Sequence, residues 1–100
     1  MQELKFAFSS TVLRKGRAHV GVVASGDLEV LMTASTGAQA DISIITSVDG
    51  YADIWEATLE RFCSRNPVAL RVKINDFGAT PGMVLLRMQQ ALDSMEMPDA

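Results

Sequence analysis

Residues 17–34 read RAHVGVVASGDLEVLMTA, and this stretch decides the fold. Small apolar residues recur at every second position on both sides of Ser25-Gly26-Asp27. Side chains of a β-strand point alternately to the two faces of a sheet, so the stretch predicts a β-hairpin with this tripeptide at its tip. A three-residue loop, or a two-residue turn with a bulge, places the small apolar residues on one face, with glycine supplying a positive φ. The predicted cross-strand pairs are Ala24 with Leu28, Val22 with Val30, and Val20 with Met32.

Three further strands and a first helix follow from the spacing of apolar residues. Strands are expected where apolar and polar residues alternate, at residues 3–8, 42–48 and 70–75. From about Tyr51 the apolar spacing changes to three and four, which is typical of one face of a helix. Asn66-Pro67 is expected to end this helix, because the residue before proline is disfavoured in the α region.

A second helix is expected to begin at Pro81. Thr80 is a suitable N-cap, and proline is favoured at the first helical position. The preceding residues form a turn from the last strand into this helix, in which Gly78 and Gly82 permit unusual backbone angles. The predicted order is therefore β-β-β-β-α-β-α.

Alternating strands indicate a sheet that is buried on one face. We therefore expect an α+β fold, a two-layer sandwich in which a mostly antiparallel sheet of about five strands carries both helices on one face. One hundred residues without repeats or a linker indicate a single domain, 1–100.

Composition excludes several classes of protein. A net charge of −3 disfavours nucleic acid as a partner, and the basic cluster at residues 14–17 is too short to reverse this. One cysteine permits no internal disulfide and no cysteine-rich metal site. No segment approaches the roughly 18 apolar residues of a membrane span, and no signal pattern precedes the first strand, so we expect a cytoplasmic protein.

The sequence predicts no catalytic or metal-binding residues. His19, the one histidine, precedes Ser25 by about 20 Å of extended strand, too far to act as its base. Cys63 falls on the apolar stripe of the first helix and is expected to be buried. Asp27 and Glu29 flank the tip and are interpreted as solvated charges, with a docking surface as the alternative. Ser25 is thus an accessible hydroxyl with nothing to activate it, which favours an attachment point for the chemistry of another enzyme.

Three segments resemble a known family. Residues 21–31, GVVASGDLEVL, resemble the attachment region of the malonate decarboxylase acyl carrier (delta) subunits. Residues 74–84, INDFGATPGMV, and residues 46–50, TSVDG, are similar to further motifs of that family. The similarity extends in order over essentially the whole chain. The acyl carrier subunits of citrate lyase are more distant relatives with a similar Ser-Gly-Asp segment.

The resemblance implies a non-catalytic carrier. Ser25 would hold 2'-(5''-phosphoribosyl)-3'-dephospho-CoA through a covalent phosphodiester, and the thiol of this group would carry acetyl and malonyl thioesters while malonate is converted to acetate and CO2. The implied partners are the acyl-carrier transferase and decarboxylase subunits, a malonyl transferase and the prosthetic-group transferase. A scaffold or regulatory subunit that acts without covalent modification is the alternative, and an independent hydrolase is a more distant one.

Overall fold

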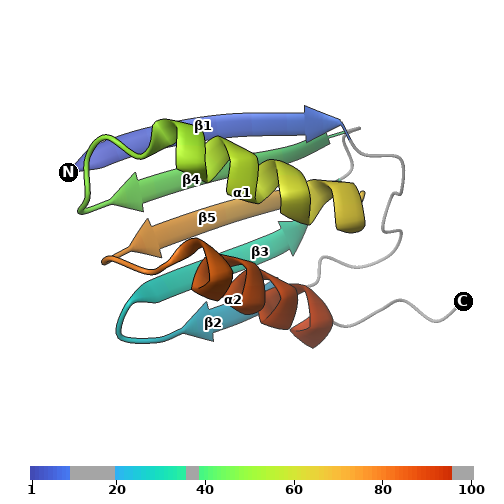
Figure 1. Cartoon of the computed structure of the whole chain (residues 1–100). Coiled ribbons are helices and arrows are strands. Elements are labelled where there is room, and N and C mark those ends of the chain that lie inside the picture. The colour runs from blue at the N-terminus through green and yellow to red at the C-terminus, as the bar shows by residue number, and fades with distance from the viewer. Residues whose placement is uncertain (10–19, 36–38, 96–100) are drawn as a thin grey trace, which may run out of the picture.

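The secondary-structure elements follow one another in the order that the sequence predicts (Figure 1). The computed structural model describes residues 1–9, 20–35 and 39–95, and within these ranges it contains five strands and two helices. The elements are β1 (Gln2–Ser9), β2 (Val20–Ala24), β3 (Leu28–Ala34), β4 (Gln39–Thr46), α1 (Ala52–Arg65), β5 (Leu70–Asp76) and α2 (Pro81–Ser94).

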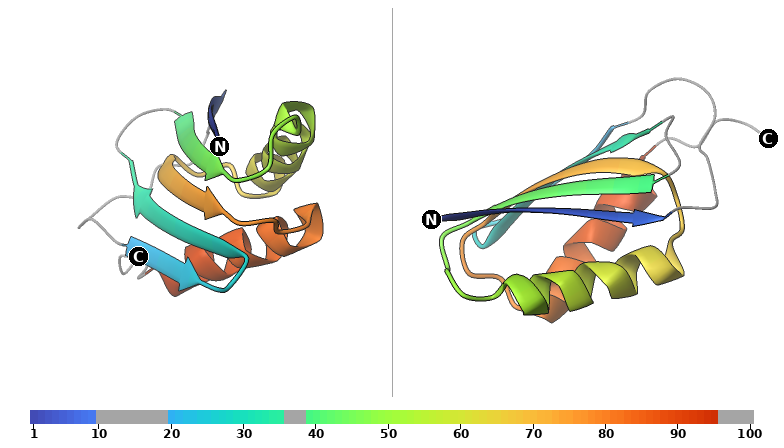
Figure 2. Two further views of the ribbon diagram at one scale, coloured as in Figure 1. Left: turned by 90° about the vertical axis from the view of Figure 1, so that its left-hand side faces the viewer. Right: turned by 90° about the horizontal axis from the view of Figure 1, so that it is seen from above.

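The strands form one sheet in the order β1-β4-β5-β3-β2. The pairs β1/β4, β2/β3 and β3/β5 are antiparallel, whereas β4 and β5 are parallel because α1 crosses over between them. Both helices lie against the same face of the sheet, with α2 in contact with β2 and β3 (Figure 2). The predicted α+β two-layer sandwich with a mostly antiparallel sheet is confirmed.

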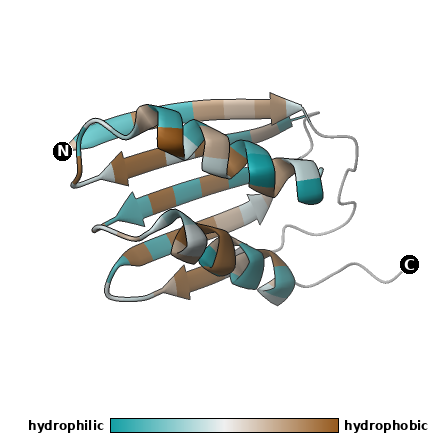
Figure 3. Ribbon diagram, viewed as in Figure 1, coloured by the Kyte–Doolittle hydropathy of each residue, from teal (hydrophilic) through white to brown (hydrophobic). Residues whose placement is uncertain are grey.

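The core lies between this face of the sheet and the helices. Along β5, Leu70, Val72 and Ile74 are buried, while Arg71 and Lys73 between them are exposed. The same alternation of hydrophobic and hydrophilic residues is visible along the strands in Figure 3. Burial of one large aliphatic side chain stabilises the fold by roughly 1.5–3 kcal/mol. The largest fully buried apolar side chains are Leu28, Met32, Ile42, Ile44, Leu59, Leu70, Ile74 and Met88.

The predicted pairing of the β2–β3 hairpin is wrong by one residue. Val23 pairs with Val30 and packs against the core, and Val22 pairs with Leu31 on the opposite face. Val22 is accordingly 62% exposed. Because positions 22 and 23 are both valine, alternation alone does not choose between the two registers. Contact with α2 settles it, by covering the face that bears Val23.

The hairpin turn also differs from the prediction. The Ser25 backbone N–H donates to the Leu28 carbonyl oxygen at 2.9 Å, which leaves Gly26 and Asp27 as a two-residue turn. Neither of these two residues has a positive φ, so the expectation for Gly26 is wrong. A turn such as type I is built from negative φ angles and needs no left-handed residue.

Strand β4 ends two residues earlier than predicted, at Thr46. The Thr46 hydroxyl accepts a hydrogen bond from the Val48 backbone N–H at 3.1 Å. A threonine side chain that binds the backbone two residues later closes a local turn, which takes the chain out of the sheet. Gly50 follows in this connection with φ of 89°.

The helix boundaries agree closely with the sequence. Asn66 is the C-cap of α1, and its backbone N–H donates to the Phe62 carbonyl oxygen at 2.9 Å. Thr80 is the N-cap of α2, and its hydroxyl accepts from the Met83 backbone N–H at 3.3 Å. Gly78 has the unusual φ that was expected, 112°, whereas Gly82 lies within the first turn of α2 without a positive φ.

Candidate functional site

Three connections meet at one end of the sheet, at the left of Figure 1. They are the tip of the β2–β3 hairpin, the β4–α1 connection and the β5–α2 connection. Two backbone hydrogen bonds join them: the Phe77 N–H donates to the Asp27 carbonyl oxygen at 2.9 Å, and the Ser47 N–H donates to the Asp76 carbonyl oxygen at 3.0 Å. The hairpin tip is therefore fixed to the rest of the fold.

Ser25 lies at this tip and is half-buried. It stands opposite Leu28, and residues that face each other across an antiparallel pair point to the same side of the sheet. Because Leu28 is fully buried beneath the helices, the Ser25 side chain also points to the helix-bearing face. The sequence predicted the position of this hydroxyl but not its direction.

The Ser25 hydroxyl is held by the carboxylate of Asp27. Ser25 Oγ lies 2.6 Å from Asp27 Oδ1 and 3.0 Å from the Leu28 carbonyl oxygen. A hydroxyl has one proton, and a carboxylate is the stronger acceptor, so the shorter contact is the charge-assisted hydrogen bond. The interpretation of Asp27 as a merely solvated charge is wrong, because its carboxylate accepts this hydrogen bond. Glu29 is exposed, and its carboxylate accepts from the Asn75 amide at 3.4 Å.

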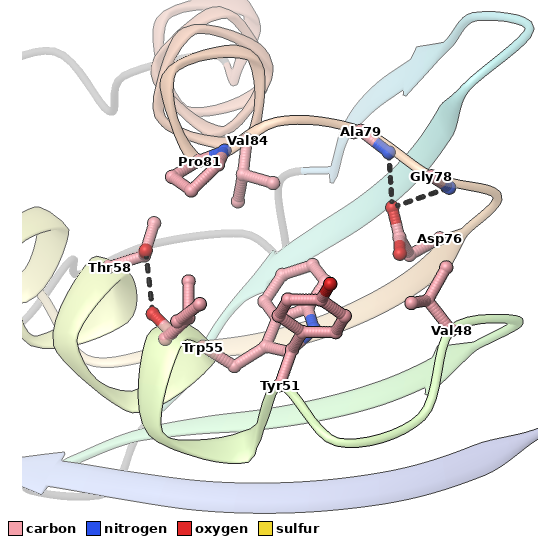
Figure 4. A pocket seen from close by; sticks show the side chains of 10 residues that line it. Val48, Tyr51, Trp55, Thr58, Asp76, Gly78, Ala79, Pro81 and Val84 are labelled. Carbon is pink, nitrogen blue, oxygen red and sulfur yellow. Dashed lines mark hydrogen bonds between the residues drawn. The ribbon is translucent and has the colours of Figure 1, made fainter.

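Asp76 connects the segments beneath the tip. It is 4% exposed, and its Oδ1 accepts from the backbone N–H groups of Gly78 at 3.2 Å and Ala79 at 2.9 Å (Figure 4). Its Oδ2 accepts from the hydroxyl of Thr46, which is also buried, at 2.8 Å. Both oxygens of this buried carboxylate thus have hydrogen-bonding partners, from the end of β4 and from the β5–α2 connection.

Sequence reasoning assigned no role to Asp76, although a signal for it exists. Leu70, Val72 and Ile74 occupy every second position of β5 and are buried. Continuing this alternation places Asp76 on the buried face, where a carboxylate must have hydrogen-bonding partners. The identity of those partners is not readable from the sequence, because Thr46 lies 30 residues earlier in the chain.

A cavity of about 260 Å³ opens between the two helices at the same end of the sheet (Figure 4). Tyr51, Trp55 and Thr58 line it from α1 and the residue before it, whereas Ala79 and Val84 line it from the side of α2. Its lining is mostly apolar. Gly78 also borders it, so the β5–α2 connection separates the cavity from the hairpin tip.

Cys63 is buried in the core, as predicted, and burial raises the pKa of its thiol to about 11. We expect thiol reagents at pH 8 to leave Cys63 unmodified in the folded chain and to react once urea unfolds it, because the thiolate is the reactive form. Since this pKa lies above the ordinary value of 9.0, the contribution of the protonated thiol to stability should be fully present below pH 9 and should be lost as the pH rises through 11. Rapid labelling of the folded chain at pH 8 would contradict this assignment.

Two groups of residues from the sequence analysis lie outside the described residues, namely His19 and the basic cluster at 14–17. Within the described ranges, no group of three or more His, Cys, Asp or Glu side chains is arranged so that it could hold a metal ion. None of the helices in the described part of the chain is long and apolar enough to cross a membrane.

Comparison with known proteins identifies the family. Residues 15–95 match the family model of the malonate decarboxylase delta subunit. The chain belongs to this family. It is 46% identical over 96 residues to the malonate decarboxylase acyl carrier protein of Azotobacter vinelandii, and 44% identical over 96 residues to that of Stutzerimonas stutzeri. Each alignment covers 95% of this chain and 97% of the relative.

A solved structure of a family member has the same fold. One chain in the crystal structure of a Pseudomonas malonate decarboxylase hetero-tetramer in complex with malonate superimposes with a TM-score of 0.77 at 45% sequence identity. The match covers 93% of this chain and 97% of that one. The resemblance inferred from the sequence motifs is therefore confirmed at the level of the family and of the fold.

Proposed function

We propose that this chain is the acyl carrier subunit of a malonate decarboxylase and that Ser25 is the attachment point of its prosthetic group. The observation that carries the proposal is the Ser25 hydroxyl at the tip of a fixed hairpin, within 2.6 Å of a carboxylate. Relatives that are named malonate decarboxylase acyl carrier proteins support the assignment of the whole chain.

The residues around Ser25 fit a phosphodiester-linked group. Gly26 has no side chain, and a Cβ built on it would meet no atom within 4 Å, so the tip is open on that side. Ser25 offers an oxygen that is neither fully buried nor freely rotating. We propose 2'-(5''-phosphoribosyl)-3'-dephospho-CoA as the group. When bound, it supplies a terminal thiol on which acetyl and malonyl groups are carried as thioesters.

Residues of this chain orient Ser25, which is the proposed anchor of the prosthetic group. Attachment needs an activated phosphoanhydride form of the group: as the bond from Ser25 Oγ to phosphorus forms, the anhydride P–O bond would break and release a phosphate leaving group, and Asp27 Oδ1 is placed to accept the hydroxyl proton. The hydrogen bond from Phe77 to the Asp27 carbonyl fixes the backbone of the tip during this step. Decarboxylation itself is proposed to be performed by other subunits. The related chain in a malonate decarboxylase hetero-tetramer supports the view that transferase and decarboxylase subunits are its partners.

Intact mass spectrometry tests the proposal. We expect the chain to gain the mass of one prosthetic group when it is co-expressed with the cognate prosthetic-group transferase. Peptide mapping should place this increment on the segment that contains Ser25. An unchanged mass with an active transferase, or an increment on another segment, would overturn the assignment.

Replacement of Asp27 by asparagine should slow attachment of the group. Asparagine keeps the size of the side chain but removes the charged acceptor of the serine proton. Loss of a charge-assisted hydrogen bond corresponds to about a tenfold lower attachment rate. The rate is measured as the time course of the mass increment at saturating transferase.

Glu29→Gln is the matched control for Asp27→Asn. Glu29 is exposed on the neighbouring strand and makes its side-chain contact to Asn75, so its change should leave the attachment rate unaltered. Equal rates for wild type and Asp27→Asn would show that this carboxylate does not assist the serine.

A further inference from the structure

The cavity between α1 and α2 lies on the same face of the sheet as the proposed anchor, Ser25, and beyond the β5–α2 connection that separates it from the hairpin tip. Ser25 shares the helix-bearing face with Leu28, and the cavity lies on this face. In the sheet, the β3 strand separates β2 from β5, so Ser25 lies two strand spacings, about 10 Å, from the end of β5. The end of β5 and the residues after it, Asp76, Gly78 and Ala79, border the cavity.

The size of the cavity restricts what can enter. Its volume of about 260 Å³ lies below the roughly 300–1,000 Å³ of sites for drug-sized molecules. It also exceeds by far the 10–15 Å³ or so that one water needs. The proposed prosthetic group is a long arm on Ser25. Its nucleotide part would therefore remain outside the cavity, while its narrow thioester end could be accommodated.

The chemistry of the lining favours an uncharged occupant. The Thr58 hydroxyl already donates to the Ile54 carbonyl oxygen at 2.7 Å, and both oxygens of Asp76 are engaged. The ten lining residues, all within the described part of the chain, include no Lys or Arg. A malonyl carboxylate would find no cationic partner here and would lie near the Asp76 carboxylate, whereas an acetyl thioester is uncharged and gives up only the hydration of its carbonyl oxygen.

The mouth of the cavity supplies a reason for an apolar group to enter it. Tyr51, Ile54 and Val48 border the cavity and are among the exposed large apolar side chains, with Tyr51 48% exposed. Figure 4 shows the aromatic side chains of Tyr51 and Trp55 on the α1 side of the cavity. An apolar occupant removes part of this surface from water, which is favourable.

We propose that this cavity receives the acetyl-thioester end of the chain's own arm and leaves the malonyl form outside. The proposal rests on the proposed attachment of the arm at Ser25. It gives the carrier two states that differ in the accessibility of the acyl group: acetyl is sheltered between subunit visits, and malonyl stays exposed to the decarboxylating partner.

Protection of the thioester measures the proposed state. Carrier with one arm, verified by intact mass, is loaded with acetyl or malonyl and treated with hydroxylamine, and each rate is divided by that of the same acyl group on free pantetheine. If the acetyl end occupies the cavity about 90% of the time, its cleavage is about tenfold slower than in the free thioester. The malonyl ratio should be close to one.

Filling the cavity should abolish the protection. Thr58→Phe places a ring in the cavity, and Ala57→Phe places the same ring at the neighbouring exposed position of α1. We expect Thr58→Phe to bring the acetyl ratio to one and Ala57→Phe to retain the tenfold protection. Ala79→Leu, which fills the cavity from the other side, replaces Thr58→Phe if that variant does not fold.

The outcomes separate the two proposals. A chain that gains no prosthetic group overturns the proposed function. A chain that carries the group but whose acetyl thioester is cleaved as fast as the free thioester overturns the cavity assignment alone. Protection that survives in a folded cavity-filling variant, Thr58→Phe or its replacement Ala79→Leu, would also overturn it. Backbone amide shifts at Ala79 and Val84 that change on acetylation, but not on malonylation, would support it independently. Protection that appears only when a partner subunit is added would mean that the partner covers the cavity, against the proposal.

Discussion

Ser25→Ala is expected to abolish attachment of the prosthetic group and, with it, malonate decarboxylation by the assembled complex. The substitution removes the oxygen that we propose to bond to phosphorus, and no side chain at the turn replaces it: Gly26 has none and Asp27 carries a carboxylate. The mass of the chain should remain that of the unmodified polypeptide. Activity of the complex should fall to that of the complex assembled without this subunit.

The fold should tolerate this change. The hydroxyl of Ser25 is half-buried, and loss of its hydrogen bonds is expected to cost about 1 kcal/mol of unfolding free energy. The backbone bond between Ser25 and Leu28 that closes the turn does not involve the side chain. Urea unfolding and binding to the partner subunits therefore show whether the loss of activity has a structural cause.

Ser47→Ala is the matched control, since Ser47 is an exposed serine that directly follows β4 and binds the end of β5 through its backbone. It should gain the group at the rate of the wild type. A mass increment on Ser25→Ala would place the attachment site elsewhere. An unmodified Ser25→Ala chain that still supports full activity of the complex would favour the alternative in which the chain acts as a scaffold.

The sequence predicts the layers of this fold well because each strand carries its own signal. In β5, three buried aliphatic residues alternate with polar or charged ones, so the two-residue period of apolar side chains is enough to identify the strand and its buried face. Thr80 and Pro81 likewise identify the start of α2 by local chemistry, and the Thr80 hydroxyl caps the helix as expected. Such features depend on neighbours within a few residues.

The hairpin register could not be predicted in the same way. Val22 and Val23 are equally apolar, so either could face the core, and the choice depends on the packing of α2 some sixty residues later. The shift of one residue has a consequence for function. It turns the Ser25 side chain toward the helices and brings Asp27 Oδ1 to its hydroxyl.

The rest of the candidate site depends on contacts between distant segments. Thr46 and Asp76 each end a strand, but their hydrogen bond exists because β4 and β5 are adjacent and parallel. The cavity similarly requires the positions of both helices. Sequence analysis found the motifs that contain these residues by resemblance, without assigning a physical role to them.

Asp76→Ala is expected to lower the free energy of unfolding by about 3 kcal/mol or more, since several buried hydrogen-bonding groups lose their acceptor together. The Thr46 hydroxyl and the N–H groups of Gly78 and Ala79 all bind this carboxylate. The carboxylate closes the turn in which Gly78 has a φ of 112°. Against a total stability of roughly 5–15 kcal/mol, this is a large loss.

Asp76→Asn should be less harmful, because an amide oxygen can still accept from the two backbone N–H groups. The matched control is Asp41→Ala: Asp41 is exposed on β4 and accepts a side-chain bond from Gln39, so its removal should change stability by at most about 0.5 kcal/mol. The expected order of urea midpoints is wild type and Asp41→Ala, then Asp76→Asn, then Asp76→Ala. Equal midpoints for the two alanine variants would contradict the role assigned to Asp76.

Loss of the Asp76 carboxylate should also loosen the hairpin tip that carries Ser25. The turn that it closes contains Phe77, whose N–H binds the Asp27 carbonyl oxygen, so loosening the turn should free the hairpin tip. We expect faster hydrogen exchange at Phe77, Gly78 and Ala79 in Asp76→Asn under conditions where the variant is still folded. A parallel decrease in the attachment rate at Ser25 would show that a rigid tip, and not merely an exposed serine, is what the modifying enzyme requires.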